Sequence, residues 1–170
     1  MTKNDMMTSV NRRRFTAALA CGLAAPAFTW PTQVQAKDSA LPVPTSLPQA
    51  ASAAAARGEP LVLLVSLPGC PFCELVRRSY LLPMRAEGLA AWQLDITNSN
   101  TPLVAFDGKT SSAALQISAW KATFTPTVLF FGPQGQELAE RLVGIAVPDF
   151  YGVYLDERLV TARKALAARR

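Results

Sequence analysis

Two cysteines three positions apart, Cys70 and Cys73, are the residues of this chain best suited to do chemistry. In the segment Cys70-Pro71-Phe72-Cys73, a thiolate at the first position can attack a disulfide, and the second thiol can then attack the mixed disulfide that results. Pro71 suits the first position of a helix, because its missing N–H leaves no hydrogen bond unmade there. Cys70 would then lie at the helix N-terminus, where free backbone N–H groups stabilise a thiolate. We therefore expect Cys70 to be the nucleophile and Cys73 the resolving thiol.

Three other roles for this cysteine pair stay open at this point. A zinc site needs about four ligands, whereas the chain has no histidine and its third cysteine, Cys21, falls in the leader described below. A structural disulfide would close so short a loop that it would remove little entropy from the unfolded chain. The pair could also be buried and inert. We favour redox chemistry, and we predict no metal and no cofactor.

The segments around the pair predict an α/β domain with a central mixed β-sheet flanked by helices. The apolar run 61–67 predicts a strand buried on both faces, directly before the cysteines. Further strands are expected at 92–96, 127–131 and 137–143, and helices at 49–57, 74–82, 112–122 and from Pro148 onward, with an irregular insert over 98–111 and a kink at Pro83. This order places the cysteine pair at the end of a strand and the start of a helix.

The N-terminus predicts a cleavable signal peptide over residues 1–36. Three consecutive arginines at 12–14 precede an uncharged, alanine-rich run over 16–30, and Ala36 offers a small residue at the cleavage point. The arginines followed by Phe15 match the core of a twin-arginine export signal. The run is too short and too weakly apolar to span a bilayer.

The signal peptide is followed by two predicted regions. Residues 37–48 carry three prolines among small and polar residues, which predicts a Pro-rich tether. Residues 49–170 are predicted to form the folded domain. A lipid anchor at Cys21 is an alternative to cleavage after the leader, although the preceding residues only loosely resemble a lipoprotein signal.

The charge balance argues against a nucleic-acid partner. The chain has 17 basic and 12 acidic residues and a formal net charge of +5. The leader contains four of the basic residues and one of the acidic ones, so 13 basic and 11 acidic residues follow it, with a net charge of about +2. This is too little for a nucleic-acid-binding surface. We expect a monomer.

From about residue 49 to residue 168 the chain resembles the thioredoxin-like superfamily. The Cys-Pro-Phe-Cys motif carries the resemblance together with residues 124–131, which resemble the loop with a cis proline that leads into an antiparallel strand of that fold. Gly144, after the last strand, also matches the family pattern. Among exported members, the chain best resembles the small SoxW-like or thiol-reductase type.

The resemblance implies how a substrate would bind. The Thr125–Pro126 peptide bond is expected to be cis and to face the dithiol. Thr125 and Pro126, together with Pro71 and Phe72, are then expected to bind an extended substrate strand, to which Thr125 offers backbone hydrogen bonds.

The chain departs from the family pattern at two positions. The buried acid that thioredoxin carries six residues before its first cysteine falls at Leu64, so the usual proton acceptor for the second thiol is missing. Glu74, Glu59 or a water molecule would have to replace it. The histidine of DsbA-type oxidases is replaced by Phe72, so the strong thiolate stabilisation of those enzymes is not expected.

The function implied by the resemblance is that of a periplasmic thiol–disulfide oxidoreductase acting on disulfides of other proteins. We favour a reductase, which would need a membrane or periplasmic thiol electron donor because the compartment is oxidising. A disulfide oxidase or isomerase is an alternative. A non-catalytic module that binds an extended peptide, or a metallochaperone that binds Cu(I) through its thiols, is another.

Overall fold

The computed structural model describes residues 40–169, and the structural statements below refer to that part of the chain. The predicted signal peptide, residues 1–36, and the first residues of the predicted tether lie outside it. Within residues 40–169, none of the helices combines the length and the apolar character needed to cross a membrane.

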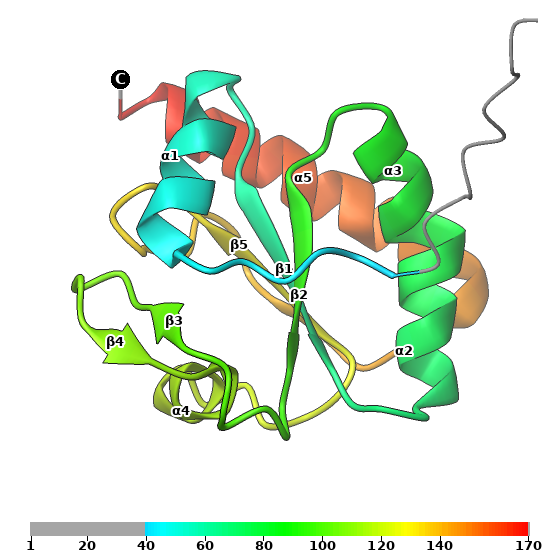
Figure 1. The fold of residues 1–170 in the computed structure, drawn as a ribbon. Helices are drawn as coiled ribbons and strands as arrows, with labels where there is room; N and C mark the ends of the chain where they lie inside the picture. The colour runs from blue at the N-terminus through cyan, green and yellow to red at the C-terminus, as the bar shows by residue number, and fades with distance from the viewer. Residues whose placement is uncertain (1–39, 170) are drawn as a thin grey trace, which may run out of the picture. The chain divides into compact units, whose positions relative to one another are not determined.

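A four-stranded mixed sheet forms the centre of the fold, in the order β2-β1-β5-β6 (Figure 1). Strand β1 (Leu61–Ser66) runs parallel to β2 (Ala91–Asp95) and antiparallel to β5 (Thr127–Phe131), and β6 (Leu142–Val143) adds to β5 in the antiparallel sense. Every residue of β1 and β5 is buried, as in strands that are covered on both faces. The predicted α/β class, a mixed sheet flanked by helices, is confirmed.

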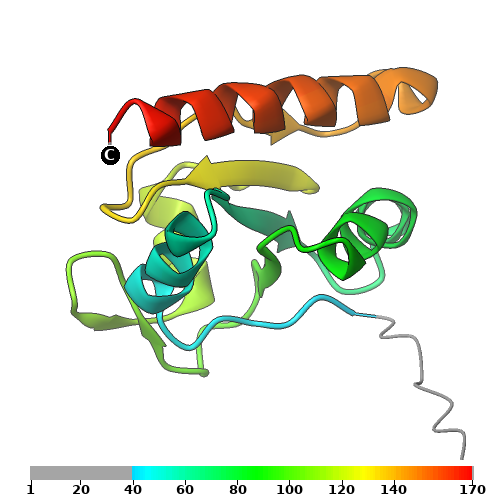
Figure 2. The same cartoon turned by 90° about the horizontal axis from the view of Figure 1, so that it is seen from above.

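The two faces of the sheet pack into separate apolar layers. One face, which includes Leu64 and Val128, packs against α5 (Tyr151–Ala167) and against the helical segment that follows the cysteines. The other face packs against α1 (Leu47–Ala56) and α4 (Ala113–Ala119). Figure 2 shows α5 on one side of the sheet and α1 and α4 on the other. The end of β1 is therefore held in place from both sides.

The helical segment after β1 is interrupted near its middle. Helix α2 (Pro71–Val76) passes into a π-helical turn (Arg77–Leu81), and α3 (Leu82–Ala86) follows. The N–H of Leu82 donates to the carbonyl five residues back, at the first residue of the π turn. Pro83 has no N–H with which to continue the regular helical pattern. The kink expected at this proline is thus a π turn just before it.

The segment predicted as a tether belongs to the domain from Leu41 onward. Leu41 is buried, and the carbonyl of Pro42 accepts a hydrogen bond of 2.9 Å from the N–H of Gln93 on β2. Helix α1 begins two residues earlier than predicted, because Ser46 caps its N-terminus. The prolines do not prevent this packing, since a segment along a sheet edge can pair through its carbonyl groups alone.

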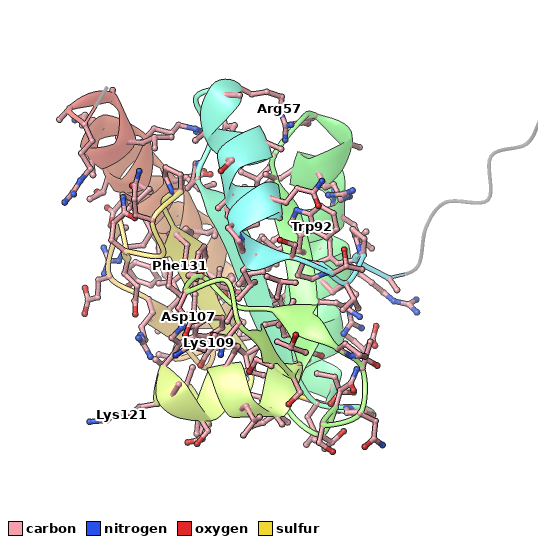
Figure 3. The ribbon with its side chains drawn as sticks, turned by 60° about the vertical axis from the view of Figure 1, so that its left-hand side comes forward. Arg57, Trp92, Asp107, Lys109, Lys121 and Phe131 are labelled. Atoms are coloured by element: carbon pink, nitrogen blue, oxygen red, sulfur yellow. The ribbon has the colours of Figure 1, made fainter. Side chains whose placement is uncertain are left out.

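The insert predicted as irregular, residues 98–111, contains a short hairpin of β3 (Leu103–Val104) and β4 (Thr110–Ser111). Phe106, between the two strands, anchors the hairpin on Phe131 of β5, with ring centroids 5.3 Å apart. Figure 3 labels Phe131 close to this hairpin. The insert therefore packs on the domain core.

The returning strand predicted over residues 137–143 is shorter in the structure. It consists of β6 and of one isolated bridge between Glu137 and β5. The consecutive residues Leu138 and Ala139 are both buried, which breaks the alternation that a strand requires. The chain then enters α5 through a 3₁₀ turn (Pro148–Phe150) that begins at the predicted start of the last helix.

Candidate active site

Cys70 and Cys73 lie where β1 passes into α2. Cys70 is the N-cap residue of α2, and its Sγ accepts a hydrogen bond of 3.2 Å from the backbone N–H of Cys73. Gly69 turns the chain into the helix with a φ of +73°, in the left-handed region that favours glycine. Both cysteines are free thiols; Cys70 is partly exposed and Cys73 is fully buried. The pair is therefore asymmetric, with one accessible sulfur and one behind it.

The pKa values of the two thiols are displaced in opposite directions. Burial tends to raise the pKa of Cys70, but hydrogen bonds from the thiol and the backbone N–H of Cys73 outweigh it. The hydroxyl of Thr125 and the N–H of Phe72 add to this effect, so the pKa of Cys70 is lowered. Burial has the largest effect on Cys73 and raises its pKa, and the hydrogen bond with Cys70 raises it further. The N–H of Leu67 lowers this pKa, but it offsets the increase only in part. An accessible thiol of lowered pKa is the better nucleophile.

The loop before β5 brings Thr125 and Pro126 to the dithiol. The side chain of Thr125 lowers the pKa of both thiols, and the Thr125–Pro126 peptide bond is cis, as the resemblance implied. Because β5 is antiparallel to β1, it begins at the end of the sheet where β1 leads to the cysteines (Figure 1). The carbonyl of Pro126 accepts a hydrogen bond of 2.7 Å from the N–H of Gly144. The backbone N–H and carbonyl of Thr125 have no hydrogen-bond partner within residues 40–169.

Apolar side chains are exposed on both sides of the dithiol. Pro71 is exposed, and the side chain of Phe72 is 58% exposed. Phe124, directly before the cis-proline pair, is 63% exposed and packs against Gly144: a Cβ added to Gly144 would lie 3.1 Å from the phenyl ring. Sequence reasoning missed Phe124, although its place next to Thr125 was a usable signal.

A family model described as a thioredoxin-like domain matches residues 47–157. The chain belongs to the thioredoxin-like domain family. The match begins at the first residue of α1 and ends within α5, so it covers the whole sheet and the cysteine motif. No curated protein matches the chain.

Several solved structures are similar to this thioredoxin-like domain. Thioredoxin O2 from Arabidopsis thaliana in its oxidised state is 19% identical, with a TM-score of 0.46, over 71% of this chain and 96% of the other. The periplasmic thioredoxin SoxS from Paracoccus pantotrophus in its reduced form is 20% identical, with a TM-score of 0.40, over 61% of this chain and 99% of the other. Thioredoxin NaTrxh from Nicotiana alata is 15% identical, with a TM-score of 0.44, over 72% of this chain and 98% of the other.

The proton acceptor considered at Glu59 is at the wrong end of this thioredoxin-like domain. Glu59 precedes β1, whereas the cysteines follow it, and a strand of that length separates the two ends by roughly 20 Å. The carboxylate of Glu59 pairs with Arg163 of α5 at 2.9 Å. Leu64, at the position of the missing acid, is fully buried in the apolar layer. Glu59 therefore has no place in the site.

Glu74 lies next to Cys73 but its carboxylate is already bound. It accepts hydrogen bonds from Arg77 and from Arg78, the latter at 3.0 Å. The hydrogen bond from Arg77 is the largest influence on its pKa, which is lowered despite some burial. A carboxylate of lowered pKa is a weak base, so Glu74 is a poor acceptor for the proton of Cys73. Within residues 40–169, no group of three or more His, Cys, Asp or Glu side chains could hold a metal ion.

Proposed function

We propose that this thioredoxin-like domain is a thiol–disulfide oxidoreductase that reduces disulfides of exported proteins through Cys70 and Cys73. The asymmetry of the pair is the observation that carries the proposal. Cys70 is partly exposed at a helix N-terminus with a lowered pKa, and the buried Cys73, with a raised pKa, lies within hydrogen-bonding distance of it. Attack and resolution need thiols of these two kinds.

In the proposed reaction the thiolate of Cys70 attacks one sulfur of a substrate disulfide. The substrate S–S bond breaks, a mixed disulfide forms at Cys70, and the other substrate sulfur leaves as a thiolate that takes up a proton. Cys73 then loses its proton and attacks Sγ of Cys70, which releases the second substrate thiol. The substrate gains two electrons, and the protein is left with a Cys70–Cys73 disulfide.

The substrate in this proposal is an extended segment of a protein that contains the disulfide. The free backbone N–H and carbonyl of Thr125 would pair with it, beside Pro126. The exposed Pro71 and Phe72 would cover the residues next to its sulfur, because apolar surface left open to solvent gains most from such burial.

The uncharged groups that lower the pKa of Cys70 support the reducing direction. The groups that lower its pKa are hydrogen-bond donors without charge, and Phe72 supplies no cation. The thiolate is therefore not stabilised strongly enough for a powerful oxidant. In the periplasm, where the predicted leader would direct the chain, a membrane or periplasmic thiol electron donor would have to return the disulfide to the dithiol.

Reduction of insulin by dithiothreitol, followed as turbidity, tests the proposal. A small amount of the protein should accelerate the reaction, and the Cys70→Ser variant should not. An unchanged rate with the unaltered protein would refute the proposal. Binding of a peptide or of Cu(I) by that inactive protein would instead favour the non-catalytic alternatives.

A further inference from the structure

A buried arginine lies behind the dithiol. Arg77, the first residue of the π turn, is 7% exposed. Its guanidinium donates to Ser66 Oγ at 2.8 Å and to Gln93 Oε1 at 2.7 Å, and it also donates to the carboxylate of Glu74. It therefore joins the helical segment that carries the cysteines to the last residue of β1 and to the middle of β2.

Burial of a guanidinium is energetically costly unless its N–H groups are hydrogen-bonded. A guanidinium removed from water needs good partners for its N–H groups, and here one carboxylate, one amide and one hydroxyl provide them. Arg77 is the first residue of the π turn, an element that often occurs at functional sites. Gln93 and Ser66 lie on the same face of the sheet as Leu64, beneath α2.

The guanidinium of Arg77 and the thiol of Cys73 both lie near the end of β1. Ser66, which binds Arg77, is the last residue of β1, and the N–H of the following residue, Leu67, faces the thiol of Cys73. Cys73 and Arg77 are also four residues apart in one helical segment, a spacing that brings side chains together on one face. Arg77 and Cys73 therefore lie on the same buried face of this helical segment.

The neighbouring charges are more exposed than Arg77. The side chain of Arg78 is 64% exposed and that of Glu74 is 44% exposed, while the side chain of Arg77 is 9% exposed. Asp95, the cross-strand neighbour of Ser66, turns its carboxylate to the N–H of Thr97 at 2.7 Å. Solvent screens exposed charges far more than buried ones. Of these charged groups, the guanidinium of Arg77 is therefore the one least screened by solvent.

We propose that Arg77 is a positioning residue of the dithiol: it fixes the helical segment on the end of β1 and the middle of β2 and favours the thiolate form of Cys73. The inference rests on the proposed function for the step that it assists, the attack of Cys73 on the mixed disulfide. In that step Cys73 gives its proton to solvent, its thiolate attacks Sγ of Cys70, and the departing substrate thiolate takes up a proton. A positive charge beside Cys73 lowers the free energy of its thiolate.

The test measures the ionisation of Cys73 directly. Cysteine is labelled with ¹³C at Cβ, the reduced full chain is titrated by NMR, and the signals are assigned with Cys70→Ser and Cys73→Ser variants. Arg77→Met should lower the acid ionisation constant of Cys73 about tenfold, and Arg77→Lys, which keeps the charge, should stay within about threefold of the unaltered protein. Arg85→Met is the matched control. It removes a guanidinium that donates to the carbonyl of Ala91 at 2.8 Å and packs over Trp92, and it should leave the ionisation of Cys73 unchanged.

Ser66→Ala covers the case in which Arg77→Met does not fold. It removes one partner of the guanidinium, leaves the charge, and should lower the ionisation constant of Cys73 by about threefold through displacement of that charge. An acid ionisation constant of Cys73 that is unchanged in Arg77→Met would overturn the inference. If only Ser66→Ala folds, an unchanged constant in that variant would overturn it. An equal change in Arg85→Met would also overturn it. Failure of the unaltered protein to reduce insulin refutes the proposed function alone, because the titration needs no substrate.

Discussion

Replacing Phe72 with histidine should turn the dithiol into a stronger oxidant. Phe72 is the second residue of α2, its side chain is 58% exposed, and its backbone N–H contributes to the lowered pKa of Cys70. The substitution removes little buried surface, so the fold should tolerate it. It introduces a group that can carry a positive charge next to the nucleophilic thiol, where the native side chain offers none.

The size of the effect follows from Coulomb's law. An imidazolium about 6 Å from the thiolate interacts with it by roughly 0.7 to 2.8 kcal/mol, between the limits set by water and by a protein surface. Because the side chain of Phe72 is largely exposed, we take a value near the middle of that range, about 1.4 kcal/mol. This stabilises the reduced form about tenfold and makes the reduction potential about 30 mV more oxidising.

Equilibration with glutathione, followed by acid quenching and intact-mass analysis, measures this shift at two pH values. The neighbouring thiolate raises the histidine pKa above its ordinary value of about 6.5. The contribution is therefore present near pH 7, where the raised histidine pKa favours the charged imidazole and the lowered pKa of Cys70 favours its thiolate. It is lost as the pH rises through the raised histidine pKa, so the variant and the unaltered protein should agree at pH 9.

Phe72→Gln is the control, since it introduces a polar side chain without a charge. The electrostatic reasoning would be refuted if Phe72→Gln shifted the equilibrium as much as Phe72→His, or if the shift from histidine were as large at pH 9 as at pH 7.

Three further predictions test the site, the domain boundary and the leader. Cys70→Ser should abolish insulin reduction and Cys73→Ser should trap substrates as mixed disulfides visible by non-reducing mass spectrometry; faster alkylation of Cys73 than of Cys70 at neutral pH would reverse their roles. Leu47→Ala should lower the free energy of unfolding in urea by about 2–4 kcal/mol, because this side chain is fully buried. A loss below about 1 kcal/mol would indicate that Leu47 belongs to the tether and not to the folded domain. Changing Arg12 and Arg13 to lysine should stop export through the twin-arginine route, as measured by cell fractionation, and unaltered export in a strain with a blocked Sec pathway would contradict this.

The junction of strand, cysteines and helix could be predicted because its signals are local. The apolar run of β1, the proline after Cys70 and the spacing to Cys73 all lie within thirteen consecutive residues, 61–73. The Thr125–Pro126 pair is equally local, directly before the β-branched and aromatic residues of β5. Such features depend little on which distant segments pack against them.

The boundary of the domain could not be predicted in the same way. The proline-rich composition of residues 37–48 is typical of a linker. In the structure, however, Leu41 and Leu47 are buried, and the carbonyl of Pro42 accepts a hydrogen bond from an N–H of β2. Whether a short apolar residue is buried depends on a surface built by other parts of the chain. The hydrophobic pattern of a segment with two leucines among prolines does not contain that information.

Arg77 shows the same limit at the site itself. Sequence reasoning placed the apolar residues of its helical segment at helical spacing and looked for the missing acid among carboxylates, yet the polar group beneath the dithiol is a cation from the helix. Its partners Ser66 and Gln93 are 11 and 16 residues away in the sequence, on two different strands. Because Leu64 is uncharged, that cation has only the partly exposed carboxylate of Glu74 as an acidic partner within residues 40–169. In the proposal made for Arg77, its buried charge favours the thiolate of Cys73, whereas an acid at the position of Leu64 would have favoured it by accepting the proton.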